Sequence, residues 1–114
     1  MRGKISDKAR LEHIINSIKK IKSFTKGVDE NKFMRTEIIQ SAVERQLEII
    51  GEAAANISEE TKEKYYYIEW TKIKAFRNVL AHEYFGISNK QVWNVINFDL
   101  LNLRKQIIKI LKDF

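Results

Sequence analysis

The chain has 114 residues, a formal net charge of +6 and no cysteine. The length predicts one domain comprising residues 1–114, with a single core and little sequence to spare. The lack of cysteine excludes disulfides and thiolate metal sites, and no apolar run is long enough for a membrane span or a secretory signal. We therefore expect a cytoplasmic protein that does not bind membranes, and the basic charge suits an anionic partner such as RNA, a nucleotide or an acidic protein.

Proline is absent and glycine occurs only four times, which favours long helices. Apolar residues recur at spacings of three and four through most of the chain, and no stretch alternates as a strand does. The first and last predicted helices have Ser6 and Ser88 as candidate N-caps. In chain order, the first predicted helix follows Ser6 and ends near residue 27. The others run from about 31 to 56, from 58 to 64, from 69 to 82, and from 88 to 111. The predicted fold class is all-α, an antiparallel bundle of four principal helices plus a short helix.

Residues 77–84 read Arg-Asn-Val-Leu-Ala-His-Glu-Tyr and hold a guanidinium, a carboxamide, an imidazole and a phenol within about two helical turns. Such a set can bind phosphate and move a proton near neutral pH. Asn78 and His82 are four residues apart and share a helical face, whereas Arg77 and His82 are separated by about 140°. Gly86 suits a helix end nearby, where the helix dipole would favour the imidazolium form of His82.

The residue types by themselves leave a structural interpretation open. Arg77 could cap helix carbonyls or pair with a carboxylate, His82 could be a satisfied polar residue at a helix end, and Tyr84 could simply pack against its neighbours. The two histidines, His13 and His82, are far apart in sequence, so a zinc site would need carboxylates for its remaining ligands, and we expect no metal.

The pattern Arg-x4-His-x-Tyr, with an asparagine directly after the arginine, resembles the signature of the HEPN superfamily and specifically its HepT-like branch. Further family-like segments occur in the expected order over roughly residues 14–111. They are Ile-Ile-Gly-Glu-Ala-Ala at 49–54, Glu-Trp at 69–70, Tyr-Phe-Gly-Ile at 84–87 and Val-Trp at 92–93. The chain departs from the pattern in lacking a proline shortly before Trp70, which affects a loop and not the motif.

This resemblance implies a HEPN-like helical fold and a metal-independent endoribonuclease that needs no cofactor. Its catalytic residues would be Arg77, Asn78 and His82. His82 would transfer protons, Arg77 would hold the phosphate oxygens, and Asn78 would orient the imidazole or donate to phosphate. The family is known for composite sites in homodimers, which suits a chain that supplies one such arginine and one such histidine. The RNA substrate, a tRNA or an mRNA, would be cut to leave a 2′,3′-cyclic phosphate.

The resemblance also implies a toxin role within a toxin-antitoxin pair. In HepT-like toxins a partner nucleotidyltransferase antitoxin of the MNT type transfers AMP to the motif tyrosine, which is Tyr84 here. The adduct would place charge and bulk where the RNA phosphate must bind. Two alternatives remain open: a non-catalytic, nucleotide-binding or substrate-presenting partner subunit of a nucleotidyltransferase, and a plain helical dimer stabilised by the motif.

Three other features have a structural and a functional interpretation. A stripe of glutamates at positions 37, 44, 48 and 52 is typical of a solvated helix face, but Glu52 could support Arg77 because it lies in a family-like segment. Lysine clusters at residues 19–26 and basic residues at 104–112 suit solvated helix ends or an anionic partner. The Tyr65-Tyr66-Tyr67 run could stack on RNA bases or form part of a core or interface.

Overall fold

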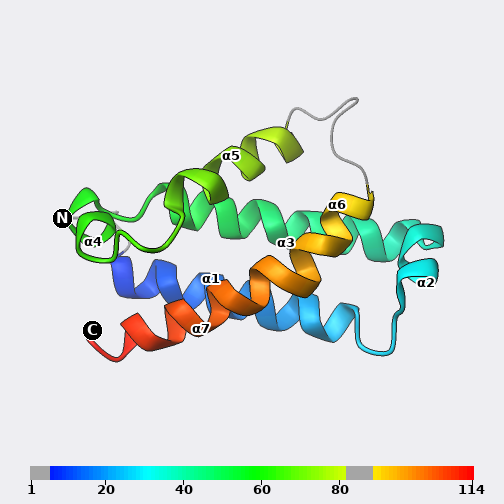
Figure 1. The fold of residues 1–114 in the computed structure, drawn as a ribbon, viewed down its shortest axis with the longest axis horizontal. Helices are drawn as coiled ribbons and strands as arrows, with labels where there is room; N and C mark the ends of the chain where they lie inside the picture. Colours follow the sequence, from blue (N-terminus) through cyan, green and yellow to red (C-terminus); the bar gives the residue numbers. More distant parts are fainter. Residues whose placement is uncertain (1–5, 82–88) are drawn as a thin grey trace.

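The computed structural model describes residues 6–81 and 89–114, and for residues 76–81 it describes the backbone only. All regular elements within these two ranges are helical, so the predicted all-α class is confirmed. They are α1 (Asp7–Phe24), α2 (Glu30–Arg35), α3 (Glu37–Ala55), α4 (Glu59–Lys64), α5 (Trp70–Ala81), α6 (Asn89–Asn94), the π-helical segment η1 (Val95–Asp99) and α7 (Leu100–Leu111) (Figure 1). Among the described helices, none combines the length and the apolar character needed to cross a membrane.

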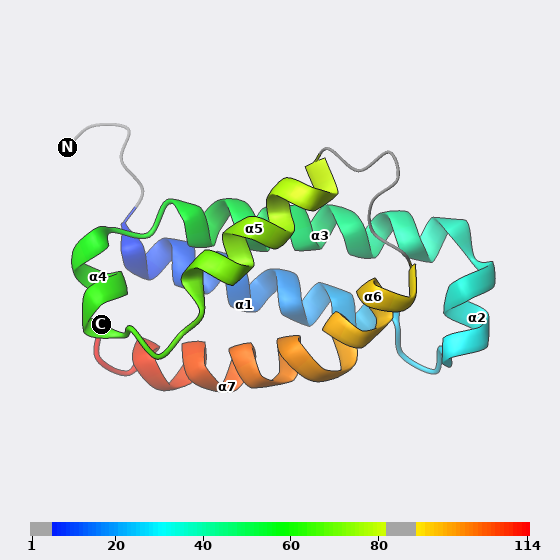
Figure 2. The same cartoon turned by 45° about the horizontal axis from the view of Figure 1, so that its top comes forward.

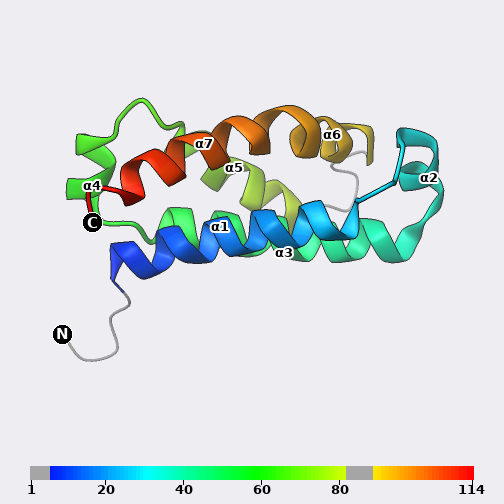
Figure 3. The same cartoon turned by 90° about the horizontal axis from the view of Figure 1, so that it is seen from below.

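The long helices form two layers. Figure 3 shows α1 and α3 side by side in one layer, with α7 and α5 across the other. The short helices α4 and α2 lie at opposite ends of the bundle, and the C-terminus ends beside α4 (Figure 2). The apolar residues that recur at spacings of three and four meet between the layers. The buried side chains from the long helices include Leu11, Ile14, Ile18, Ile21, Val43, Leu47, Ile50, Ala54, Leu100, Leu103 and Ile107.

Helix α1 begins as predicted. The Ser6 hydroxyl accepts a hydrogen bond from the Ala9 N–H at 3.1 Å, which satisfies one of the unpaired donors at the helix start. The helix ends at Phe24, three residues before Gly27, whose φ of +72° lies in the left-handed region that favours glycine.

The predicted single helix over residues 31–56 is wrong, because the chain breaks at Thr36 into α2 and α3. Thr36 is extended (φ −118°, ψ 93°), and its hydroxyl donates to the Lys32 carbonyl at 2.6 Å. Such side-chain bonds let threonine compete with the helical ladder. The break also lets the Gln40 side-chain amide donate to the Phe33 carbonyl at 2.8 Å.

The predicted short helix over residues 58–64 is confirmed as α4, with Ser58 as its N-cap. The loop after α4 is fixed from inside, because the indole N–H of Trp70 donates to the Tyr65 carbonyl at 3.2 Å in a buried bond. Helix α5 then starts at Trp70, within one residue of the prediction.

The predicted last helix, residues 88–111, is interrupted by one π-helical turn. Residues 95–99 form η1 between α6 and α7, and the Asn97 side chain donates to the Trp93 carbonyl at 2.8 Å beside it. A π turn of this kind changes which side chains share a face, and such turns are frequent at functional sites. The predicted Ser88 cap lies outside the described residues.

Candidate functional site

The motif predicted from the sequence begins near the C-terminal end of α5. Arg77 and Asn78 belong to this helix, although their side chains are not described. His82 and Tyr84 lie outside the described residues. Arg77 follows Trp70 by seven residues and Ile73 by four, so the helical register aligns it with these two positions. Trp70 is buried, and Ile73 packs against the core.

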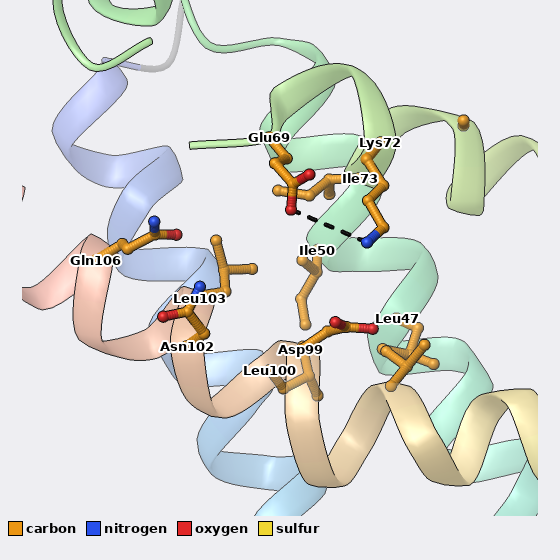
Figure 4. A pocket seen from close by; sticks show the side chains of 12 residues that line it. Leu47, Ile50, Glu69, Lys72, Ile73, Asp99, Leu100, Asn102, Leu103 and Gln106 are labelled. Carbon is orange, nitrogen blue, oxygen red and sulfur yellow. Dashed lines mark ion pairs between the residues drawn. The ribbon is translucent and has the colours of Figure 1, made fainter. Parts of the chain in front are cut away.

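A groove of about 330 Å³ lies beside α5, between this helix, α3 and the η1–α7 segment (Figure 4). Its floor is apolar. Its polar residues are Glu69, directly before α5, Lys72 of α5, and Asp99, Asn102 and Gln106 of the facing segment. The apolar lining comprises Leu47, Ile50, Ile73, Ala75, Val95, Leu100 and Leu103. A groove of this size with an apolar floor and few polar groups has the usual character of a binding site.

The rim of the groove carries both signs of charge. Lys72 Nζ lies 3.9 Å from Glu69 Oε1, and both side chains are largely exposed. Asp99 lies across the groove from this pair (Figure 4). Exposed ion pairs of this kind contribute little to stability, so both groups can change partners when another molecule binds.

Glu52, the predicted supporting residue, lies near the C-terminal end of α3. Its side chain is exposed, and its backbone carbonyl accepts a hydrogen bond from the Asn56 side chain at 2.9 Å. Since α3 and α5 run in opposite directions (Figure 1), this end of α3 lies near the start of α5, about two turns before Arg77. A supporting role for Glu52 in the site stays a prediction.

Sequence reasoning did not identify the facing side of the groove. Asp99, Asn102 and Gln106 recur at spacings of three and four, which is the ordinary pattern of a solvated helix face. It also missed Gln46 on α3, whose side-chain Oε1 is buried and has no hydrogen-bond partner in the structure as described. A glutamine among charged residues gives no signal of this in the sequence.

Two groups in the described ranges have clearly shifted pKa values, and both lie at the α4 end of the bundle. The hydrogen bond from the Tyr65 hydroxyl to Asp113, at 2.7 Å, raises the pKa of Tyr65. Burial favours a higher pKa for Asp7, but hydrogen bonds from Ser58 and Thr61 outweigh it and lower the pKa. Within residues 6–81 and 89–114, no cluster of histidine or acidic side chains could hold a metal ion.

Comparison with known proteins identifies the family to which the chain is similar. The family model described as "Ribonuclease HepT-like" matches residues 14–110, which include α5 and the whole motif. In Methanocaldococcus jannaschii, "Gamma-glutamylcyclotransferase and putative RNase MJ0434" is 38% identical over 106 residues, 93% of this chain and 48% of that protein. The chain thus spans about half the length of that relative.

Two further relatives are matched over nearly their full length. "Putative RNase MJ1380" of the same organism is 37% identical over 88% of this chain and 92% of its own. "Probable ribonuclease HepT" of Thermococcus cleftensis is 35% identical over 96% of this chain and 99% of its own. No solved structure matches the chain significantly.

Proposed function

Because the chain belongs to the HepT-like ribonuclease family, we propose that it is a metal-independent endoribonuclease that cuts single-stranded RNA with the motif of residues 77–84. The match over residues 14–110 carries the proposal, because it covers the bundle and the motif together. The family assignment confirms the resemblance drawn from the sequence. The roles of Arg77, Asn78 and His82 remain proposals of ours.

The proposed reaction is transesterification at a phosphodiester. His82 takes the proton of a ribose 2′-hydroxyl, whose oxygen attacks the adjacent phosphorus and forms a 2′,3′-cyclic phosphate. The bond from phosphorus to the 5′-oxygen breaks, and that oxygen receives a proton from an imidazolium. Arg77 binds the non-bridging oxygens, where charge builds up in the transition state. Asn78 orients the imidazole or donates to the same phosphate without repelling it.

A homodimer would bring two copies of this motif to one cleft, so that one imidazole acts as base and the other as acid. The described surface that suits a second copy is the groove beside α5. Phe98 and Leu101, next to it on the η1–α7 segment, are 69% and 45% exposed. The rim is self-complementary, since Lys72 of one copy can meet Asp99 of the other across a two-fold axis.

The proposed biological role is that of a toxin controlled by a partner nucleotidyltransferase. Transfer of AMP to the Tyr84 hydroxyl would join the phosphorus of AMP to the phenol oxygen and release pyrophosphate from ATP. The new phosphodiester brings negative charge next to Arg77 and competes with the RNA phosphate. The family assignment supports the nuclease, and the motif tyrosine supports this mode of control.

The product of the reaction tests the proposed function. Purified protein in EDTA should cut single-stranded RNA into fragments that end in a 2′,3′-cyclic phosphate and a 5′-hydroxyl, as read by mass spectrometry. Products with a 5′-phosphate would mean that water and not the 2′-hydroxyl attacks, which contradicts the mechanism. Binding of RNA or nucleotide without any cleavage would favour the non-catalytic partner subunit.

A further inference from the structure

The Tyr65-Tyr66-Tyr67 run divides into one buried ring and two exposed ones. Tyr65 is buried, and its hydroxyl donates to Asp113 at 2.7 Å. Tyr66 and Tyr67 are 81% and 46% exposed. The interpretation of the run as core therefore holds for Tyr65 and fails for the two residues after it.

The two exposed rings pack on a neighbouring ring and a stretch of backbone that are themselves held in place. The Tyr67 ring meets the Tyr65 ring edge to face, with centroids 6.3 Å apart, and the Tyr66 and Tyr67 centroids are 6.2 Å apart. The backbone beneath them is held because the Ile68 N–H donates to the Tyr65 carbonyl at 3.1 Å. Little conformational freedom of the backbone is then left to lose when a ligand binds.

We propose that Tyr66 and Tyr67 form a stacking surface for the bases of single-stranded RNA, placed so that the strand continues along α5 to the motif. This inference rests on the proposed ribonuclease function and names a second contact for the same substrate. Every base presents a π-face, so exposed aromatic rings bind single strands with little sequence preference. The phenol hydroxyls can also bond to base edges.

The size of the surface argues against a stable protein interface. Tyr66, Tyr67 and the half-exposed Phe114 together present roughly 340 Å² if each aromatic side chain has about 200 Å² of surface. A stable protein partner buries about 800 Å² on each side. Two rings are enough for one or two bases, so the area fits a nucleic-acid strand better.

Charged groups of both signs surround the rings, so base stacking and not charge should supply the affinity for RNA. Lys64 Nζ lies 5.4 Å from the centre of the Tyr65 ring, but Glu63 directly precedes Lys64, and Asp113 accepts the hydrogen bond from the Tyr65 hydroxyl at 2.7 Å. A surface of mixed charge attracts phosphates weakly. The affinity it provides should therefore depend little on salt.

The position of this stacking surface sets how many nucleotides separate the stacked base from the scissile phosphate. Tyr67 precedes α5 by three residues, and the axis from Trp70 to Arg77 covers about 10 Å at 1.5 Å per residue. Stacked nucleotides advance about 3.4 Å each along a strand, so about three or more nucleotides separate the stacked base from the scissile phosphate. Lys74, which is exposed on α5, can meet a phosphate in between.

Binding of a 2′-fluoro single-stranded RNA of about 12 nucleotides tests this surface without cleavage. The double variant Tyr66→Ala/Tyr67→Ala should bind at least about tenfold more weakly, with an unchanged slope of affinity against salt. Tyr66→Phe/Tyr67→Phe keeps both rings and should retain most of the affinity. Ile38→Ala, which alters an exposed apolar side chain on α3, is the matched control and should bind as the wild type does.

Three results would overturn the stacking surface. They are wild-type affinity in the double alanine variant, an equal loss in the phenylalanine pair, and a wild-type protein that does not bind the probe at low salt. Loss of binding to a protein partner with RNA affinity unchanged would show a protein docking site instead. The nuclease proposal fails separately, if wild-type protein binds the probe through the tyrosines but cuts no RNA in EDTA.

Discussion

The carboxylate of Asp7 accepts a hydrogen bond from the Ser58 hydroxyl at 2.5 Å, across 51 residues of chain. It also accepts from the Ser58 N–H at 3.0 Å and from the Thr61 hydroxyl at 2.5 Å. These bonds tie the first turn of α1 to the start of α4. They thereby fix the end of the bundle from which the tyrosine loop and α5 continue.

Replacing Asp7 should destabilise the fold. Asp7→Ala leaves Ser58 and Thr61 without their acceptor, and we expect a loss of about 1–2 kcal/mol in the free energy of unfolding. Urea unfolding followed by circular dichroism measures it. Glu12→Ala, which removes another carboxylate from α1 at an exposed position, should change little. Equal effects of the two variants would mean that the Asp7 bonds contribute nothing specific.

The same carboxylate predicts a pH dependence. Its pKa is lowered in the folded protein by the bonds from Ser58 and Thr61, despite the opposing effect of burial. A depressed folded pKa gives a stabilisation that is complete above the unfolded value of about 3.9. It is lost as the pH falls further, through the folded value. The stability difference between wild type and Asp7→Ala should therefore be constant at neutral pH and shrink below pH of about 4.

Replacement by leucine should have opposite effects on stability at two glutamines of α3. Gln40→Leu removes the bond to the Phe33 carbonyl and should lower stability by about 1–3 kcal/mol. Gln46→Leu removes a buried oxygen that has no partner among the described residues, and it should leave stability unchanged or raise it by about 1 kcal/mol. Thermal unfolding of both variants gives the comparison. A larger loss in Gln46→Leu would show that its oxygen is satisfied in solution.

If the groove beside α5 is the dimer interface, a charge placed next to it should break the dimer. Leu101→Glu puts a charge where the second copy should pack, and light scattering at micromolar concentration should then report a monomer. Ile38→Glu alters a side chain that is 78% exposed on α3 and should remain dimeric. A dimeric Leu101→Glu protein would place the interface elsewhere, and a monomeric wild type would remove the composite site.

Tyr84 should be the residue modified by the partner. Co-expression with the cognate nucleotidyltransferase should add AMP to the chain, and RNA cleavage should fall as modification rises. Tyr84→Phe keeps the ring but lacks the acceptor oxygen, so it should stay active and resist neutralisation. Peptide mapping that finds AMP on Tyr66 or Tyr67, or intact mass without any AMP, would contradict this switch and leave the nuclease intact.

Local chemistry explains which parts of the fold were predictable. The Ser6 cap, the short helix that begins after Ser58 and the apolar spacing of α1 depend on residues within a few positions of each other, and all were predicted correctly. The break at Thr36 was missed because no proline or glycine marks it, and a threonine that bonds to the Lys32 carbonyl gives no signal in the apolar spacing. The π turn at residues 95–99 was missed because a continuous apolar spacing fits either kind of helix.

The candidate site was predictable only as a motif. Arg77 and Asn78 lie on α5 as expected, while the positions of His82 and Tyr84 fall outside the described residues. The groove next to the motif needs α3, α5 and α7 together, so no single segment indicates it. The two exposed tyrosines were ambiguous for a similar reason, since burial depends on what the loop packs against.

Cleavage of single-stranded RNA in EDTA by wild type, Arg77→Ala and His82→Ala tests the central claim most directly. We expect the wild type to cut and each variant to be slower by about a hundredfold or more, since each lacks a transition-state clamp or a proton-transfer group. Glu12→Ala, an exposed change on α1, should retain the activity of the wild type. Undiminished cleavage by well-folded Arg77→Ala and His82→Ala proteins would contradict the assignment of this motif as the active site.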